Sequence, residues 1–173
     1  GKIFIKEFPP ATITANQLKA FVKKFEEQGI KLDAIVLDYL NLMHSTVGNN
    51  SYERIKHVTE QVRAMSYLFN CPIISATQLN RAGFDTDNPD LATISESIGL
   101  AATADAIISI FQNEEDRGIG VIRLGMMKNR YGPRGNTQAM RIDYSTLTIE
   151  QADDIEIGED MDDTLNVLAG LAQ

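Results

Sequence analysis

A short apolar run that ends in a single carboxylate constrains the fold of this chain more than any other feature. Residues 34 to 37 are all apolar and come directly before Asp38. Such a run is typical of a buried parallel strand. Ligands of open α/β sheets bind beyond the carboxyl ends of the strands, so Asp38 is predicted to emerge where a nucleotide and its metal are held, as a Walker B aspartate does. The alternative is an aspartate that only caps the following turn.

A second strand candidate also ends in polar residues. The run from Cys71 to Thr77 is followed by Gln78, Asn80 and Arg81. Two neighbouring strands would then deliver polar side chains to one rim of the sheet. The amide of Gln78 can donate a hydrogen bond to a γ-phosphate oxygen or orient an attacking water. An ordinary loop glutamine is the alternative interpretation.

Two cations on alternate residues precede a Gly/Pro turn further along the chain. Lys128 and Arg130 come shortly before Gly132 and Pro133. On an extended hairpin arm these two side chains would point to the same side. Paired cations that reach the charge of a transition-state phosphate are what an arginine finger requires. A solvated basic hairpin is the alternative.

Three segments, taken together in this order and spacing, resemble the DnaB-type replicative helicases, which are ring ATPases of the RecA fold. The segments are residues 37–43, 77–81 and 128–135. The resemblance covers roughly residues 1 to 149, and residues 1–10 and 95–105 look most like the version in T-even-like bacteriophages. It implies an ATP-driven DNA helicase that acts in the cytoplasm of a bacterial host.

The resemblance also implies roles for the polar residues of the site. ATP and magnesium are the expected cofactors. Asp38 would hold magnesium through water, and Gln78 would sense the γ-phosphate. Lys128 and Arg130 would complete the site of a neighbouring subunit in trans. The subunit would therefore act in a homo-hexamer.

The implied DNA contacts and partners follow from the same resemblance. The turn around Ser95, Glu96 and Ser97 is expected to contact single-stranded DNA in the channel of the ring. The family usually has arginine where this chain has Ser95, so the backbone N–H groups would make the phosphate contact. The polar stretch from 44 to 50 is the second channel candidate, although solvent explains its polarity equally well. Primase and a helicase loader are the other expected partners.

One departure from the family is large. No Gly-x-x-x-x-Gly-Lys-Ser/Thr motif occurs, so the cradle for the β- and γ-phosphates is missing. The family also carries its catalytic glutamate upstream of the Walker B strand. We therefore expect the chain to be the C-terminal part of a longer helicase that lacks the N-terminal phosphate-loop portion.

The predicted fold class is α/β, a RecA-like core with a mainly parallel sheet flanked by helices and an antiparallel C-terminal hairpin extension. Helices are expected after the capping box of Thr14 and Gln17, from about Ser51, and around 98–101. Strands are expected at 3–5, 34–37, 72–77, 106–111, 121–127, 138–142 and 147–149. The apolar residues predicted to face the core from the first two helices are Leu18, Phe21, Val22, Phe25, Ile55, Val58, Val62, Met65 and Phe69.

Charge is distributed unevenly along the 173 residues. Residues 150–173 hold eight acidic side chains and no basic ones, and this segment is predicted to be a disordered tail beyond the domain at 1–149. Residues 117–142 carry six Lys or Arg and no Asp or Glu. This basic strip suits contact with phosphates, despite a net charge of -8.

The sequence disfavours a membrane protein and a zinc site, and it leaves two alternative functions open. No apolar run is long enough to span a bilayer, and His44 and His57 lack partners at zinc-ligand spacing. Cys71 is the only cysteine and is expected to be a buried structural thiol.

A RecA-type recombinase or other RecA-fold ATPase would share Asp38 but explains the basic hairpin less well. A non-catalytic assembly or partner-docking module would explain the missing phosphate loop.

Overall fold

The computed structural model describes residues 1–78, 98–133, 135 and 137–152. The chain divides into two compact units, residues 1–107 and 108–173. The elements in chain order are α1 (Ala15–Glu27), β1 (Ile35–Leu37), the 3-10 turn η1 (Leu40–Leu42), α2 (Ser51–Phe69), β2 (Ile73–Ser75), α4 (Ile98–Thr103), β3 (Ala106–Phe111), α5 (Glu114–Gly118), β4 (Val121–Asn129), β5 (Thr137–Asp143) and β6 (Thr148–Gln151).

Helix α1 begins at the predicted capping box. The Oγ1 of Thr14 accepts from the backbone N–H of Gln17 at 3.3 Å, and the Gln17 side chain accepts from the Thr14 N–H at 2.8 Å. The helix ends before Gly29, whose φ of +74° is a conformation that favours glycine. Leu18 and Val22 are buried, which confirms the predicted inward face in part. The two phenylalanines of that face, at 21 and 25, are only partly buried.

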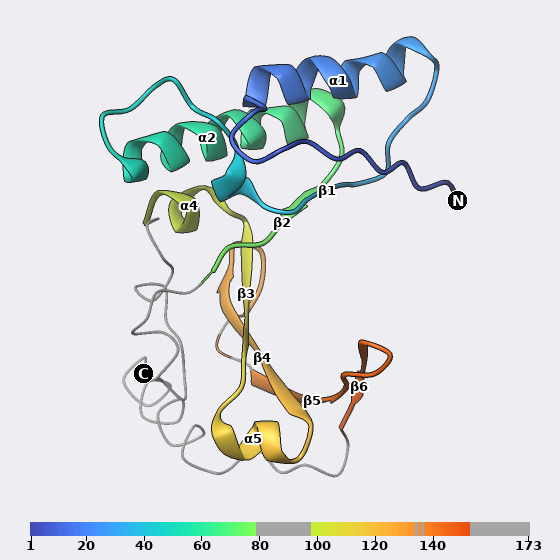
Figure 1. Ribbon diagram of the computed structural model, residues 1–173, viewed down its shortest axis with the longest axis vertical. Coiled ribbons are helices and arrows are strands. Elements are labelled where there is room, and N and C mark those ends of the chain that lie inside the picture. The colour runs from blue at the N-terminus through green and yellow to red at the C-terminus, as the bar shows by residue number, and fades with distance from the viewer. Residues whose placement is uncertain (79–97, 134, 136, 153–173) are drawn as a thin grey trace. The chain divides into compact units, whose positions relative to one another are not determined.

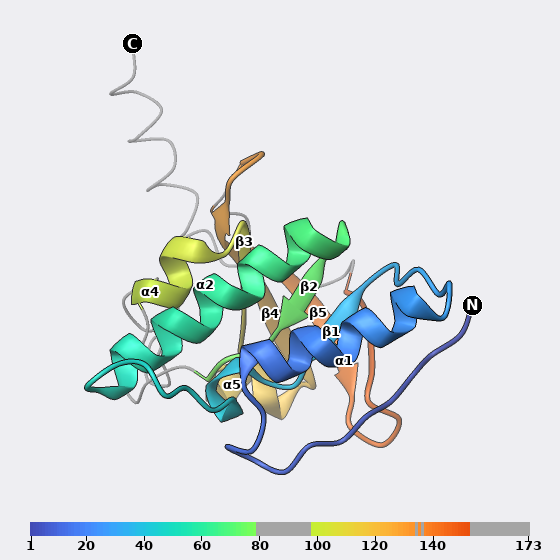
Figure 2. The ribbon, with the colours of Figure 1, turned by 90° about the horizontal axis from the view of Figure 1, so that it is seen from above.

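Helix α2 confirms the sequence prediction in full. Asn50 caps its first turn by accepting from the Glu53 N–H at 2.8 Å, and Asn70 ends it in the left-handed conformation. The five residues predicted to face inward are all buried: Ile55, Val58, Val62, Met65 and Phe69. Figures 1 and 2 show α1 and α2 running side by side over the same side of β1 and β2.

Strands β1 and β2 pair in parallel, with Ile35 opposite Ile73 and Leu37 opposite Ser75. Ile35 and the partly buried Leu37 and Ile73 pack into the two apolar clusters beneath the helices. The other face carries Val36 and Ile74, which are 72% and 57% exposed. The predicted parallel sheet is thus covered on one face only within the described part of the chain. Parallel sheets are normally covered on both.

The predicted strand at residues 3–5 is wrong. These residues are not in a strand, because no segment within the described part of the chain pairs with them. Instead Phe4 packs on Phe25 and Phe8 packs on Phe21, with ring centroids 4.9 Å and 5.7 Å apart. Aromatic contacts with α1 therefore hold this segment, while Ile3 and Ile5 stay exposed.

The second unit is built on the antiparallel pairs β4–β5 and β5–β6, in a four-stranded sheet of order β3-β4-β5-β6. The predicted antiparallel extension is confirmed. Helix α5 was not expected, although its capping box of Asn113 and Asp116 is a recognisable sequence signal. Strand β6 runs to Gln151, so the first residues of the predicted tail are paired. Residues 153–173 lie outside the described structure.

The remaining sequence predictions concern the cysteine, the helix around 98–101 and membrane spans. Cys71 is buried, as expected, and its burial raises the pKa of the thiol, with a smaller contribution from Glu26. Leu100 and Ala101 of α4 are also buried. Among the described residues, no helix is both long and apolar enough to cross a membrane.

Candidate nucleotide-binding rim and basic hairpin

The parallel pairing of β1 and β2 places Asp38 and Gln78 at the same edge of the sheet. Asp38 directly follows β1, and Gln78 comes three residues after the end of β2. Both side chains are exposed. The structure thus brings together the two strand ends that the sequence singled out, while the chemical roles of the two residues stay predictions.

Ser75 holds the backbone next to Asp38. Its hydroxyl donates to the Leu37 carbonyl at 2.8 Å and accepts from the Leu40 N–H at 3.2 Å. Leu40 is itself buried. The turn is therefore fixed from the protein side while the Asp38 carboxylate faces solvent. Sequence reasoning missed Ser75, although a hydroxyl at the end of an apolar strand was the available signal.

A third hydrogen bond across this rim joins the Thr77 hydroxyl to the Asn41 side-chain oxygen, at 3.3 Å. It ties the segment after β2, which leads to Gln78, to η1. Side-chain hydrogen bonds thus connect the ends of both strands to the turn after Asp38. Supporting contacts of this kind preorganise a binding site.

The donor set at the rim fits magnesium in one specific way. No group of three or more His, Cys, Asp or Glu side chains that could hold a metal occurs among the described residues. Mg²⁺ is commonly bound through one or two carboxylates, several waters and the phosphates of the substrate. A single exposed carboxylate such as Asp38 matches that mode and does not match an all-protein metal cage.

The tip of the β4–β5 hairpin is organised by Asn129. Its side-chain oxygen accepts from the Tyr131 N–H at 3.2 Å, and its amide donates to the Pro133 carbonyl at 3.0 Å. A Cβ on Gly132 would lie 2.8 Å from that amide nitrogen, so glycine suits the position. Lys128 is the penultimate residue of β4, and the exposed Arg130 follows the strand. Asn129 therefore shapes the turn that presents Arg130.

One cation of the basic strip is committed to an internal ion pair. Arg123 donates from Nε and Nη2 to the two carboxylate oxygens of Asp116, at 2.7 Å and 2.9 Å. Asp116 is 2% exposed. The hydrogen bond from Arg123 holds the pKa of Asp116 below its ordinary value, against the opposing effect of burial. The strip available to phosphates is therefore smaller than the sequence count indicates.

The second channel candidate, the loop at 44–50, is folded onto the start of α2. The Asn49 N–H donates to the Glu53 carboxylate at 2.7 Å, and the Arg54 Nε donates to the Gly48 carbonyl at 3.3 Å. The Ser45 hydroxyl lies 3.2 Å from the Nδ1 of His57. This loop has its own hydrogen-bonded structure. The first channel candidate, Ser95 to Ser97, lies outside the described residues, directly before α4.

Comparison with known proteins identifies the family. The family model for the DnaB-like helicase C terminal domain matches residues 1–148. The chain is 25% identical over 139 residues to the DnaB-like replicative helicase of Enterobacteria phage T4, covering 78% of this chain and 29% of that protein. It is 29% identical over 164 residues to the replicative DNA helicase DnaB of Mycoplasma pneumoniae, covering 85% of this chain and 34% of that protein.

The fold agrees with the sequence comparison. A solved DnaB-like replicative helicase, described together with its interactions with primase, matches with a TM-score of 0.71 at 18% identity, covering 82% of this chain and 36% of the other. The chain thus spans about a third of the length of the curated relatives named above. Its architecture is RecA-like, as predicted, and the chain belongs to the DnaB-like helicase C-terminal domain family.

Proposed function

We propose that this chain forms part of the ATPase domain of a replicative DNA helicase that couples ATP hydrolysis to movement along single-stranded DNA. The observation that carries the proposal is the rim at which the parallel strands before Asp38 and Gln78 end side by side, inside the segment that matches the family model. Ligands of α/β sheets bind at this edge. The same match favours a helicase over a recombinase or a non-catalytic docking module.

Each site residue has a distinct proposed role. Asp38 would hold a magnesium ion through water, and the ion would supply positive charge that stabilises the phosphates of the nucleotide. Gln78 donates to the γ-phosphate or orients the attacking water. Lys128 and Arg130 reach the nucleotide of an adjacent subunit, where they balance charge on the transferring phosphoryl group.

The proposed assembly is a homo-hexameric ring around single-stranded DNA in the cytoplasm of a bacterial host. The turn of Ser95, Glu96 and Ser97 contacts the DNA backbone inside the ring. Primase is a proposed partner because a similar solved helicase is described with its primase interactions. A helicase loader is the other proposed partner.

The rim is tested by Asp38→Asn in a ring-forming subunit that contains this chain together with a phosphate-binding loop. Removing the charge that orients metal-bound water should lower ATP turnover or magnesium affinity by roughly 10- to 100-fold. Asp33→Asn is the matched control, because Asp33 is an exposed aspartate just before β1. Equal turnover of the two variants across a magnesium titration would refute the assignment of Asp38.

The hairpin is tested by Arg130→Ala in the same ring. Loss of an arginine finger lowers turnover by about a thousandfold, with nucleotide affinity nearly unchanged. Arg141→Ala is the control, since Arg141 is an exposed cation on β5 of the same strip. Mixed rings then locate the contact. Subunits with Arg130→Ala that also lack their own phosphate lysine should depress neighbouring wild-type sites, and undiminished activity per wild-type site at every ratio contradicts the trans role.

The 173-residue chain by itself provides a simpler test. It contains no phosphate-loop motif, so it should hydrolyse ATP no faster than buffer and bind nucleotide weakly. Turnover that survives purification and disappears in Asp38→Asn would contradict this expectation.

A further inference from the structure

The tip of the β4–β5 hairpin extends beyond the described register of its two strands. That register ends with Gly125 opposite Thr137, and the Gly135 N–H donates to the Met126 carbonyl at 2.9 Å further out. Arg130 lies beyond this bond, in the turn that follows β4. A turn lies outside the strand ladder, so its conformation is set by bonds among its own residues.

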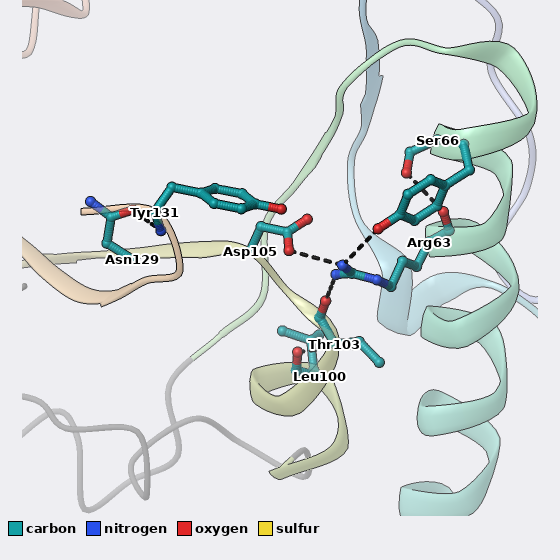
Figure 3. Close-up of polar contacts among 8 residues, drawn as sticks. Arg63, Ser66, Leu100, Thr103, Asp105, Asn129 and Tyr131 are labelled. Atoms are coloured by element: carbon teal, nitrogen blue, oxygen red, sulfur yellow. Dashed lines mark hydrogen bonds and ion pairs between the residues drawn. The ribbon is translucent and has the colours of Figure 1, made fainter.

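Asn129 supplies two bonds of this kind from one side chain. Its Oδ1 accepts from the Tyr131 N–H at 3.2 Å, as Figure 3 shows, and its Nδ2 donates to the Pro133 carbonyl at 3.0 Å. A side-chain oxygen that bonds to the backbone two residues on forms an Asx turn. The ring closed by the first bond contains the whole backbone of Arg130. Asn129 therefore restrains the two dihedral angles from which the Arg130 side chain projects.

The neighbouring residues leave the interior of the turn to Asn129. A Cβ on Gly132 would lie 2.8 Å from the Asn129 Nδ2, so glycine gives the amide the room that it needs. Arg130 is exposed, and Tyr131 is 81% exposed. Asn129 itself is partly buried. The turn is thus built around the Asn129 side chain, and Arg130 lies on its outside.

We propose that Asn129 is a positioning residue for Arg130: its Asx turn presents the Arg130 guanidinium to the nucleotide site of the adjacent subunit. The inference rests on the proposed function, in which Arg130 acts in trans, and it names what sets the position of that side chain. Loss of the Asn129 side chain frees the backbone at Arg130. The guanidinium stands at the end of a long side chain, so a small rotation of this backbone displaces it from the phosphoryl group.

The first test is Asn129→Ala in an ATP-hydrolysing ring that contains this chain. It should lower ATP turnover by roughly 10- to 100-fold, since a displacement of about 1 Å at an active site can cost about 100-fold. The KM for ATP should hardly change, because a group that acts only on the transition state does not contribute to ground-state binding.

Asp143→Ala is the matched control. The Asp143 Oδ1 accepts from the Ser145 N–H at 2.8 Å, which is the same kind of turn at the other hairpin of the sheet. Both variants lose one side-chain bond to the backbone two residues on. Asp143→Ala should leave turnover unchanged, because the turn that it weakens does not contain Arg130.

Mixed rings separate positioning in trans from plain stabilisation. Each Asn129→Ala subunit in the mixture also lacks its own phosphate lysine, so only wild-type subunits hydrolyse ATP. Activity per wild-type site should fall as the share of these subunits rises. Rings doped with subunits that lack only the phosphate lysine give the baseline. A residue that merely stabilises its own subunit leaves the wild-type sites at this baseline.

Two further variants assign the effect to the bond. Asn129→Ala combined with Arg130→Ala should be no slower than Arg130→Ala alone, because both changes remove one function. Asn129→Ser keeps a weaker acceptor for the Tyr131 N–H, so it should recover part of the turnover. If Asn129→Ala does not assemble into rings, Asn129→Ser is compared with wild type instead.

Amide hydrogen exchange reports the turn without any turnover. In peptides that cover residues 127–133, the Tyr131 N–H should lose its protection in Asn129→Ala and keep part of it in Asn129→Ser. Exchange in the paired segment at 121–125 should stay as in wild type. Unchanged protection of the tip in Asn129→Ala would show that this side chain does not hold the turn, which overturns the inference.

The kinetic outcomes separate the inference from the function on which it rests. Arg130→Ala rings with normal turnover overturn the proposed role of the hairpin, and the inference with it. Slow Arg130→Ala rings together with normal Asn129→Ala rings overturn the inference alone. An equal fall in Asn129→Ala and Asp143→Ala reduces Asn129 to a structural role. Wild-type sites that stay at the baseline in mixed rings do the same, and either result overturns the inference.

Discussion

Among the described residues, each unit contains an arginine–aspartate pair, and the two pairs differ in the burial of the aspartate and in the way the arginine donates. The arginine side chains are equally exposed, at 21% in Arg63 and in Arg123. Their partners are not: the Asp116 side chain is 3% exposed, whereas that of Asp105 is 43% exposed. Arg123 also uses two nitrogens on one carboxylate, whereas Arg63 divides its donors among three groups.

The difference teaches which ion pair can change partners. A buried carboxylate that loses its cation has no water to replace it, so the pair in the second unit acts as a fixed part of the scaffold. A half-exposed carboxylate can exchange its partner for water at small cost. The pair in the first unit can therefore be broken at little cost to the stability of the fold.

The largest expected effect comes from Arg123→Met, which leaves Asp116 buried without its cation. Breaking a buried pair in this way costs about 3 to 5 kcal/mol. Denaturant unfolding of the chain should show this loss of stability. Asp116→Asn combined with Arg123→Met should recover part of it, since no unpaired charge is left. A loss under about 1 kcal/mol would make the two pairs equivalent and end the comparison.

Acid should weaken the buried pair through Asp116 itself. Its folded pKa lies below the ordinary value of 3.8, so its stabilising contribution is present above that value and is lost as pH falls through the folded pKa. The effect should be smaller than that of Arg123→Met, because protonation keeps the hydrogen-bonded shape. Unfolding of wild type and Asp116→Asn should converge as pH is lowered below 3.8, and parallel curves would contradict this.

Arg63→Gln should cost only about 1 kcal/mol of stability, because solvent screens the bond to Asp105. The measurement is the same denaturant titration. A loss of stability much smaller than that of Arg123→Met sharpens the contrast between the two pairs. A loss as large as that of Arg123→Met would show that the exposed pair also belongs to the scaffold.

Lys56→Gln gives the smallest effect and sets the baseline. Exposed pairs four residues apart on a helix contribute roughly 0.3 to 0.5 kcal/mol. Lys56 and Glu60 are both about half exposed, with 4.0 Å between their charged atoms. The unfolding midpoint should hardly move, and added salt should abolish the difference. A larger shift would mean that burial is not what ranks the three pairs.

Local signals account for what the sequence predicted well. Capping residues and the spacing of apolar residues located α1 and α2, since both depend on neighbours within one or two turns. The apolar run before Asp38 located β1 for the same reason. The segment at 3–5 shows the limit of such signals: its pattern suits a strand, but a strand also needs a partner, which pattern alone does not reveal.

The candidate site was predictable where its chemistry is carried by residue type. Asp38, Gln78 and the hairpin cations were found because carboxylates, amides and cations after strands are informative. The supporting contacts were not. Ser75 bonds to Leu40 and Leu37, which are 35 and 38 positions away in the sequence. Arg63 bonds to Asp105, which is 42 positions away. Pairings over such distances depend on the completed fold, and one sequence does not encode them visibly.

The face of β1 and β2 that the helices leave exposed should limit the solubility of the isolated chain. Val36 and Ile74 point away from the helices and are mostly in water. Apolar surface of this kind is a recognised cause of self-association. The free chain should therefore lose solubility as its concentration rises, and replacing both residues by threonine should raise the concentration at which it stays monodisperse. A protein that binds the isolated chain should therefore also be tested with the double threonine variant, to exclude nonspecific binding to this apolar face.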